Sequence, residues 1–201
     1  MRKEMKKKDL EIKLQSLALF SEPKAHLEQY PTPSVIASDI LFSAYASGDI
    51  EGKDVADLGC GTGIFAIGAS LLGASRVVAY DIDASALEIA KRNAESLGCG
   101  IEFVESDVRD VAGRFDTVLM NPPFGSQNKH ADTPFLMKAM EIADSVYSIH
   151  MACTSDYIEK TALSAGKQVT GRITYKYEIP HTFSFHNKTK KSVDVIAVSI
   201  R

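Results

Sequence analysis

The stretch DVADLGCGTG, residues 54–63, determines the fold that we expect for this chain. A short apolar strand at 54–58 runs into glycines at 59, 61 and 63, and the apolar segment 64–73 then has the pattern of a helix. Glycines at such a turn let the backbone bend tightly and approach a ligand, because no Cβ stands in the way. The stretch therefore predicts one unit of a parallel sheet with a ligand site at the turn.

The same alternation of strands and helices continues along the chain. We expect strands at 54–58, 76–82, 101–106, 115–120, 145–151, 168–179 and 192–200, and helices at 33–47, 64–73, 84–97, 132–144 and 155–165. Thr32 and Asp83 are the expected N-caps of two of these helices. Short apolar strands that alternate with helices predict a parallel sheet covered on both faces. The fold class is therefore α/β, a doubly wound, Rossmann-like sheet. It is mostly parallel, with an antiparallel ribbon formed by the last two strands.

Length and composition favour one domain over residues 1–201, since 201 residues suit one hydrophobic core. Leucines at helical spacing in 6–20 predict an N-terminal helical extension within residues 1–30. No apolar run approaches the roughly 18 residues of a membrane span. The three cysteines are odd in number and far apart, so we expect reduced thiols, no metal site and a cytoplasmic location: Cys60, Cys99 and Cys153.

Charge is distributed unevenly. Residues 1–20 hold six Lys or Arg against three acids, and residues 160–201 hold eight against two, although the whole chain has a net charge of −3. Basic ends on an acidic protein permit a local anionic partner such as nucleic acid, and they are equally compatible with simple solvated ends.

Acidic residues follow three successive strands. Asp57 precedes the glycines, Asp81 ends the next strand, and Asp107 follows the third. The glycine spacing is GxGxG and not the GxGxxG of dinucleotide sites, and a carboxylate beside a pyrophosphate would be repelled. A cationic amino-acid ligand with a ribose would be favoured, which points to S-adenosylmethionine. The alternative is a tight turn with exposed acids at the strand ends.

A second motif, NPPF at 121–124, ends the fourth strand. Two prolines fix the backbone, so the Asn121 side-chain oxygen and the Pro122 carbonyl can both accept N–H bonds from one planar amine. Phe124 can stack on a base, worth about 1–3 kcal/mol. The motif therefore predicts methylation of an exocyclic amine such as adenine N6. The alternative is a proline turn with Asn as a turn residue and Phe in the core.

These motifs carry a family resemblance. LEQYPTP (27–33), DLGCGTG (57–63), NPPFG (121–125) and FHNKTKKSVDV (185–195) together resemble the class I S-adenosylmethionine-dependent methyltransferases that modify amino or amide nitrogens. More narrowly, they resemble the archaeal and eukaryotic small-subunit ribosomal RNA adenine-N6 methyltransferases. The resemblance spans about residues 10 to 200.

The resemblance implies roles for individual residues. A loop would cover the methionine end of the cofactor and the glycine turn would form its floor, with acids holding the ribose and the adenine edge. These cofactor residues would be Gln29, Tyr30, Thr32, Asp57, Gly59, Cys60, Gly61, Asp81, Ile82, Asp107, Val108 and Asn121. The target amine would be held by Asn121, Pro122 and Phe124. The family also implies a small zinc-binding activator protein as a partner besides RNA.

The C-terminal segment interleaves aromatic and basic residues. Tyr175 and Tyr177 share one face of a strand, and we expect them in the core. The loop beyond them can bind RNA, because Lys neutralises phosphates and aromatic rings stack bases. The expected substrate-binding residues are Phe185, His186, Lys188, Lys190 and Lys191.

Three alternative functions remain open at this point. A glutamine-N5 protein methyltransferase of the release-factor type uses the same motif logic on a side-chain amide. A guanine-N2 RNA methyltransferase also carries a motif like NPPF. A non-catalytic RNA-binding protein could retain the fold.

Overall fold

The computed structural model describes residues 5–125, 130–180 and 190–201, and it leaves out the side chains of 178–180, 190 and 191. Most expected elements are present, with ends shifted by a few residues. The helices are α1 Lys7–Gln15, α2 Ser34–Ala46, α3 Ile64–Leu71, α4 Ala84–Ser96, α5 Thr133–Ile142 and α6 Ser155–Ser164. Short 3₁₀ turns are η1 Ala25–Leu27, η2 Val108–Asp110 and η3 Ala152–Thr154. The strands are β1 Asp54–Leu58, β2 Arg76–Asp81, β3 Glu102–Glu105, β4 Phe115–Met120, β5 Ala143–Met151, β6 Val169–Pro180 and β7 Lys190–Ile200.

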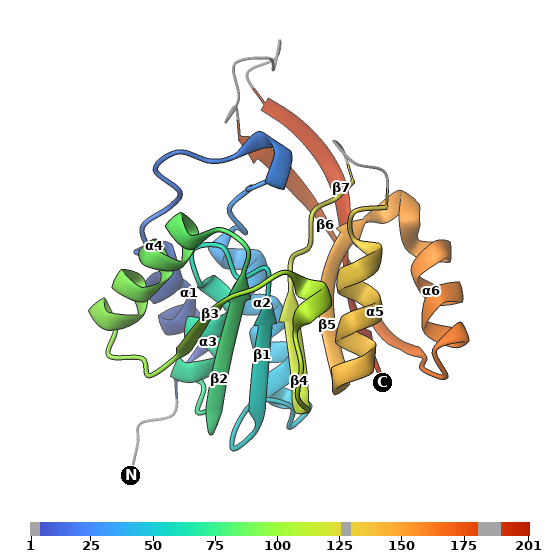
Figure 1. Cartoon of the computed structure of the whole chain (residues 1–201), viewed down its shortest axis with the longest axis horizontal. Helices are drawn as coiled ribbons and strands as arrows, with labels where there is room; N and C mark the ends of the chain where they lie inside the picture. Colours follow the sequence, from blue (N-terminus) through green and yellow to red (C-terminus); the bar gives the residue numbers. More distant parts are fainter. Residues whose placement is uncertain (1–4, 126–129, 181–189) are drawn as a thin grey trace.

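The strands form one sheet in the order β3-β2-β1-β4-β5-β7-β6, seen face-on in Figure 1. Strands β3 to β5 are parallel, and β7 runs antiparallel to both β5 and β6. The α/β prediction with a C-terminal antiparallel ribbon is confirmed. Successive strands run outward in opposite directions from the junction of β1 and β4, which makes this junction the switch point where ligands bind in such sheets.

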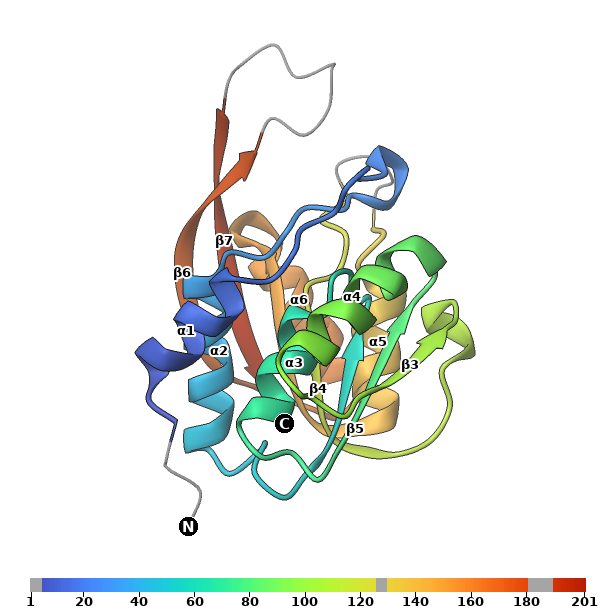
Figure 2. The same cartoon turned by 90° about the vertical axis from the view of Figure 1, so that its left-hand side faces the viewer.

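Helices cover both faces of the sheet. Side chains of α1 to α4 form one hydrophobic core with one face of the strands, while α5 and α6 enclose the second core on the opposite face. Leu10, Leu14 and Leu17 are buried in the first core, so the N-terminal leucine pattern is a genuine packing face, although α1 itself ends at Gln15. The ribbon of β6 and β7 rises beyond the rest of the sheet on the side of the covering segment 20–33 (Figure 2). Among the described residues, none of the helices combines the length and the apolar character that a membrane span requires.

The two expected N-caps differ in outcome. The Asp83 side chain accepts a hydrogen bond from Ser85 N at the start of α4, as predicted. The Thr32 prediction is wrong: α2 begins at Ser34 after Pro33, with no side-chain cap. The Thr32 hydroxyl is instead bonded by the Asn121 amide, 89 residues further along the chain. A tertiary contact at the switch point therefore replaces the local cap.

Candidate active site

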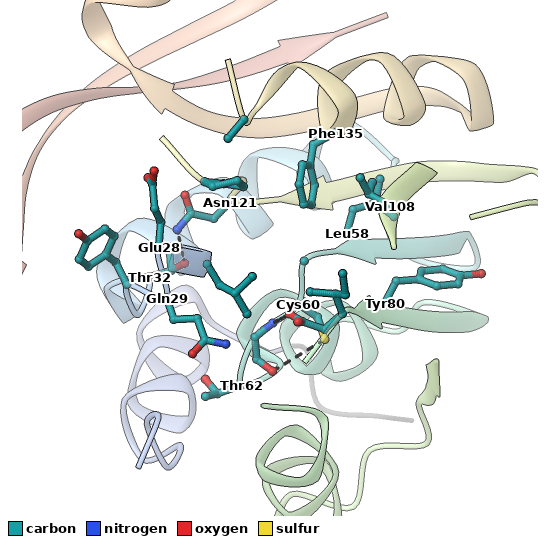
Figure 3. A pocket seen from close by; sticks show the side chains of 18 of the residues that line it. Glu28, Gln29, Thr32, Leu58, Cys60, Thr62, Tyr80, Val108, Asn121 and Phe135 are labelled. Carbon is teal, nitrogen blue, oxygen red and sulfur yellow. Dashed lines mark hydrogen bonds between the residues drawn. The ribbon is translucent and has the colours of Figure 1, made fainter. Parts of the chain in front are cut away.

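A cavity of about 490 Å³ opens at the carboxyl ends of β1, β2 and β4. Pockets of 300–1,000 Å³ suit small molecules and cofactors. Figure 3 shows Asn121 beside Glu28 and Thr32, with Phe135 and Val108 further along the cavity. The predicted residues that line it are Gln29, Tyr30, Thr32, Gly59, Cys60, Gly61, Asp81, Ile82, Asp107, Val108 and Asn121. Asp57, Pro122 and Phe124 are not among the lining residues.

The glycine turn forms the floor of the cavity. Gly59 and Gly61 have φ angles of +68° and +54°, a left-handed conformation that L side chains rarely adopt. A Cβ built on Gly61 would lie 2.9 Å from the ring of Phe20, and one on Gly59 would lie 3.0 Å from the ring of Phe135. Two aromatic rings thus lie directly against this turn, and neither was identified from the sequence.

Asp57 lies behind the turn and not in the cavity, with 1% of its surface exposed. One carboxylate oxygen accepts a bond from Ala66 N at 2.9 Å, and the other has no hydrogen-bond partner among the described residues. Burial, with a smaller contribution from the charge of Asp81, raises the Asp57 pKa to about 8. A cationic group nearby would lower this pKa and stabilise the charged carboxylate.

Asp81 presents its carboxylate at the end of β2, next to the exposed Ile82. Its oxygens accept bonds from Gly61 N at 2.8 Å and Asp83 N at 2.9 Å, which fix the carboxylate beside the glycine turn. Burial raises the Asp81 pKa. A fixed carboxylate at a second strand end is the arrangement that binds a ribose diol in doubly wound sheets.

Asp107 is paired with Arg109. The Arg109 guanidinium donates to the Asp107 carboxylate at 2.6 and 2.9 Å, and the Arg109 backbone N–H donates at 2.9 Å. The hydrogen bonds from Arg109 lower the Asp107 pKa to about 2. The carboxylate therefore remains charged, and Arg109 also lines the cavity beside Val108.

Asp83 connects the covering segment to the sheet, a role that the sequence did not reveal. Lys24 Nζ and Gln29 Nε2 each donate to its carboxylate at 2.7 Å, and Gln29 Oε1 accepts from Lys24 N at 2.8 Å. Burial alone would raise the Asp83 pKa, but the bonds from Lys24, Ser85 and Gln29 hold it well below its usual range. The Gln29 amide is therefore bonded at both ends within this clamp and fixes the loop over the cavity.

The NPPF corner closes the cavity on its far side. The Asn121 amide donates to Thr32 Oγ1 at 3.0 Å, while its Oδ1 atom is buried without a partner among the described residues. Pro122 is buried and Phe124 is half-buried. The Phe124 ring packs edge-on against Tyr177, with centroids 5.8 Å apart and planes at 87°.

The structure describes little of the predicted RNA-binding residues. Phe185, His186 and Lys188 lie outside the described residues, and Lys190 and Lys191 begin β7 without described side chains. Within the described ranges, no three His, Cys, Asp or Glu side chains gather as a metal site would require.

The site fits S-adenosylmethionine by its own features. Gly59 and Gly61 line the cavity, Asp81 presents a fixed carboxylate that suits a ribose, and the unpaired Asp57 oxygen lies buried directly behind the glycine turn. The unpaired Asn121 oxygen adds an acceptor for a second ligand at the same cavity.

Comparisons with known proteins agree with this geometry. Residues 35–147 match the family described as Methyltransferase small domain. The rRNA N(6)-adenosine-methyltransferase METTL5 of Danio rerio is 42% identical over 98% of this chain and 98% of that protein. Mettl5 of Drosophila melanogaster, with the same activity in its name, is 38% identical over 95% of this chain and 94% of that protein.

A solved structure covers almost the same length. The crystal structure of PH1948 from Pyrococcus horikoshii, provisionally named an RNA methyltransferase, is 46% identical with a TM-score of 0.92, covering 98% of this chain and 97% of that one. A magnesium protoporphyrin IX methyltransferase from Synechocystis, 18% identical with a TM-score of 0.62, shares the fold, and its structure holds S-adenosylmethionine bound. The chain thus belongs to the Methyltransferase small domain family and, within it, to the group of S-adenosylmethionine-dependent methyltransferases that contains the METTL5 proteins.

Proposed function

We propose that this enzyme methylates the N6 atom of an adenine in ribosomal RNA. The observation that carries the proposal is the buried, unpaired Oδ1 atom of Asn121 at the end of β4. A buried acceptor without a partner costs about 1–3 kcal/mol, so it favours a ligand that supplies an N–H donor. Relatives that match nearly the whole chain carry adenosine-N6 methylation of rRNA in their names.

The chain's own residues would orient the target amine. Asn121 Oδ1 accepts one N–H, and the carbonyl of Pro122 accepts the second from the rigid proline corner. The Asn121 amide nitrogen is already bonded to Thr32, which restrains rotation of the amide and leaves its oxygen as the acceptor for the target amine. Two acceptors below the amine favour a pyramidal nitrogen with its lone pair directed at the methyl group.

The cofactor supplies, when bound, a methyl group on a positively charged sulfur and a neutral leaving group. No strong base is required before attack, since the amine proton leaves after the transfer to water or a backbone carbonyl. Placement of the two reactants in line then provides most of the acceleration. The accessible part of the Phe124 ring stacks on the base and offsets the few kcal/mol of unstacking.

The alternatives act on a glutamine amide or on guanine N2. The adenine proposal is favoured because the similarity to the rRNA N6-adenosine methyltransferases includes both chain ends, outside the matched domain at 35–147. Incubation with labelled S-adenosylmethionine and either deproteinised ribosomal RNA or a release factor, followed by digestion, tests this. N6-methyladenosine supports the proposal. Methylglutamine, N2-methylguanosine, or cofactor binding without any transfer would refute it.

We also propose an activator protein and a cytoplasmic site of action. Strand β3 forms one edge of the sheet, and its Phe103 and Val104 are only partly buried, which leaves apolar surface there for a partner such as the small zinc-binding activator that the family resemblance implies. Co-purification with such a partner should raise activity at fixed enzyme concentration. Equal activity of the chain with and without it would remove the activator from the proposal.

A further inference from the structure

Tyr177 on β6 is fully buried, with no exposed surface, although β6 is an edge strand of the sheet. Its hydroxyl donates a hydrogen bond of 2.9 Å to the backbone carbonyl of Pro31. Pro31 belongs to the covering segment and lines the cavity. One atom of a strand side chain therefore anchors the segment over the cofactor site.

The ring of the same tyrosine supports the catalytic corner. It meets Phe124 edge-to-face at 5.8 Å, a geometry that contributes about 0.5–1.5 kcal/mol beyond burial. Phe124 is half-buried, so the tyrosine fixes the ring orientation while part of its surface stays accessible. The position of Phe124 thus depends on the ring of Tyr177, and the position of Pro31 depends on its hydroxyl.

A second bond joins the same two segments directly, from the Asn121 amide to Thr32. The covering segment and the NPPF corner are therefore linked once by their own side chains and once through Tyr177. We propose that Tyr177 is a positioning residue, which holds the covering segment and the Phe124 ring in the arrangement that binds cofactor and base together. This inference rests on the proposed function for the role of Phe124, but not for the link to Pro31.

Core packing alone does not require the hydroxyl. A phenylalanine would occupy the same buried space without a polar atom, whereas the buried hydroxyl needs a partner and finds one in Pro31. Burial raises the Tyr177 pKa, so the phenol remains protonated and keeps donating in neutral and mildly alkaline solution. The side chain therefore has two separable functions that conservative variants can divide.

Tyr177→Phe removes the hydroxyl and keeps the ring. We expect affinity for S-adenosylhomocysteine, measured by calorimetry, to fall about 3- to 10-fold, the range of one net hydrogen bond. At saturating cofactor the turnover number with ribosomal RNA should fall less than the affinity does, because the ring and its contact with Phe124 remain. Tyr177→Leu also removes the ring edge, so turnover should fall at least about 10-fold at saturating cofactor.

Tyr175→Phe is the matched control, because it deletes the same atom from the same face of β6, two residues away and outside the cavity lining. Its affinity for S-adenosylhomocysteine should equal that of the wild type. The proposal is overturned if Tyr177→Phe binds S-adenosylhomocysteine as the wild type does, or if Tyr175→Phe weakens binding equally. Thermal melts verify that each variant is folded, and Tyr177→Phe alone decides the Pro31 link if Tyr177→Leu does not fold.

The calorimetric measurement of S-adenosylhomocysteine binding does not depend on the RNA reaction. If the wild type methylates no ribosomal RNA, the proposed function fails while the calorimetric comparison of Tyr177→Phe and Tyr175→Phe still tests the link to Pro31. If the wild type is active and Tyr177→Leu turns over normally, the support of Phe124 is refuted and the proposed function stands.

Discussion

Replacement of Asn121 by alanine tests whether its amide binds the substrate or stabilises the fold. The variant loses the Oδ1 acceptor and the bond from Nδ2 to Thr32. Removal of one preorganised hydrogen-bonding group at a reacting centre lowers kcat by about 100- to 1,000-fold, or about 2.7–4 kcal/mol. Cofactor affinity should change by less than about 10-fold, since only the Thr32 bond is shared with the covering segment.

The effect of Asn121→Ala on the free energy of unfolding should be small, unlike its effect on kcat. The lost bond to Thr32 costs about 0.5–1.5 kcal/mol, while removal of the buried, unpaired oxygen relieves about 1–3 kcal/mol. The side chain lies at the edge of an open cavity, so its truncation leaves no closed void. The net change in the free energy of unfolding therefore runs from a loss of about 0.5 to a gain of about 2.5 kcal/mol, so the Tm of the free protein should lie between about 2 °C below and about 10 °C above that of the wild type.

Asn93 provides the matched control. It is also an asparagine, 5% exposed, but its amide makes three bonds, from Ala18 N and to the carbonyls of Ala18 and Thr62. Asn93→Ala should lower the free energy of unfolding by about 2–4 kcal/mol. Scanning calorimetry of both variants without ligand, with single-turnover kinetics of Asn121→Ala, tests the contrast. Equal destabilisation of the two variants would falsify the idea that the Asn121 oxygen is unpaired in the free protein and accepts a hydrogen bond only from a substrate.

Three further predictions concern the cavity and the RNA surface. Burial raises the pKa of Asp57 to about 8, so the folded state binds this proton more tightly than the unfolded chain does. The contribution of Asp57 to stability is therefore full below about pH 4 and declines as the pH rises toward 8. The urea midpoint of the Asp57→Asn variant should lack this decline with pH. Gly61→Ala should destabilise by about 1–2 kcal/mol and weaken S-adenosylhomocysteine binding, because φ is +54° and the new Cβ would lie 2.9 Å from an aromatic ring. Gly100→Ala, in open space, should behave as wild type, and equal losses in both calorimetric titrations would contradict this. Replacement of Lys190 and Lys191 by alanine should reduce the salt slope of RNA binding by up to about 2, and an unchanged slope in filter binding would place these lysines off the RNA.

The order of strands and helices was predictable because each strand is apolar and short and each helix carries a regular apolar face. The antiparallel ribbon followed from the missing helix between the last two strands. The N-cap at Asp83 was also predictable, since the residue, the helix that follows and the bond to Ser85 are local in sequence.

Contacts between distant loops were not predictable. Lys24 and Gln29 bond to Asp83 across 59 and 54 residues. The apolar periodicity of a sequence does not predict which loop residues will contact a distant segment. Phe20 and Phe135 were missed for the same reason, because their place against the glycines depends on how their segments pack. The Thr32 cap was wrong because a partner 89 residues away took its hydroxyl.

The link between Pro31 and Tyr177 spans 146 residues, and this separation bears on when the cofactor site is completed during synthesis. Local strand–helix units can form early, but a contact of this sequence separation closes only after nearly the entire polypeptide has emerged. Ligand binding stabilises the conformation that contains the finished pocket, so a nascent chain that lacks β6 should bind the methyl donor more weakly than the complete fold does. Affinity for that donor should therefore rise when β6 joins the sheet.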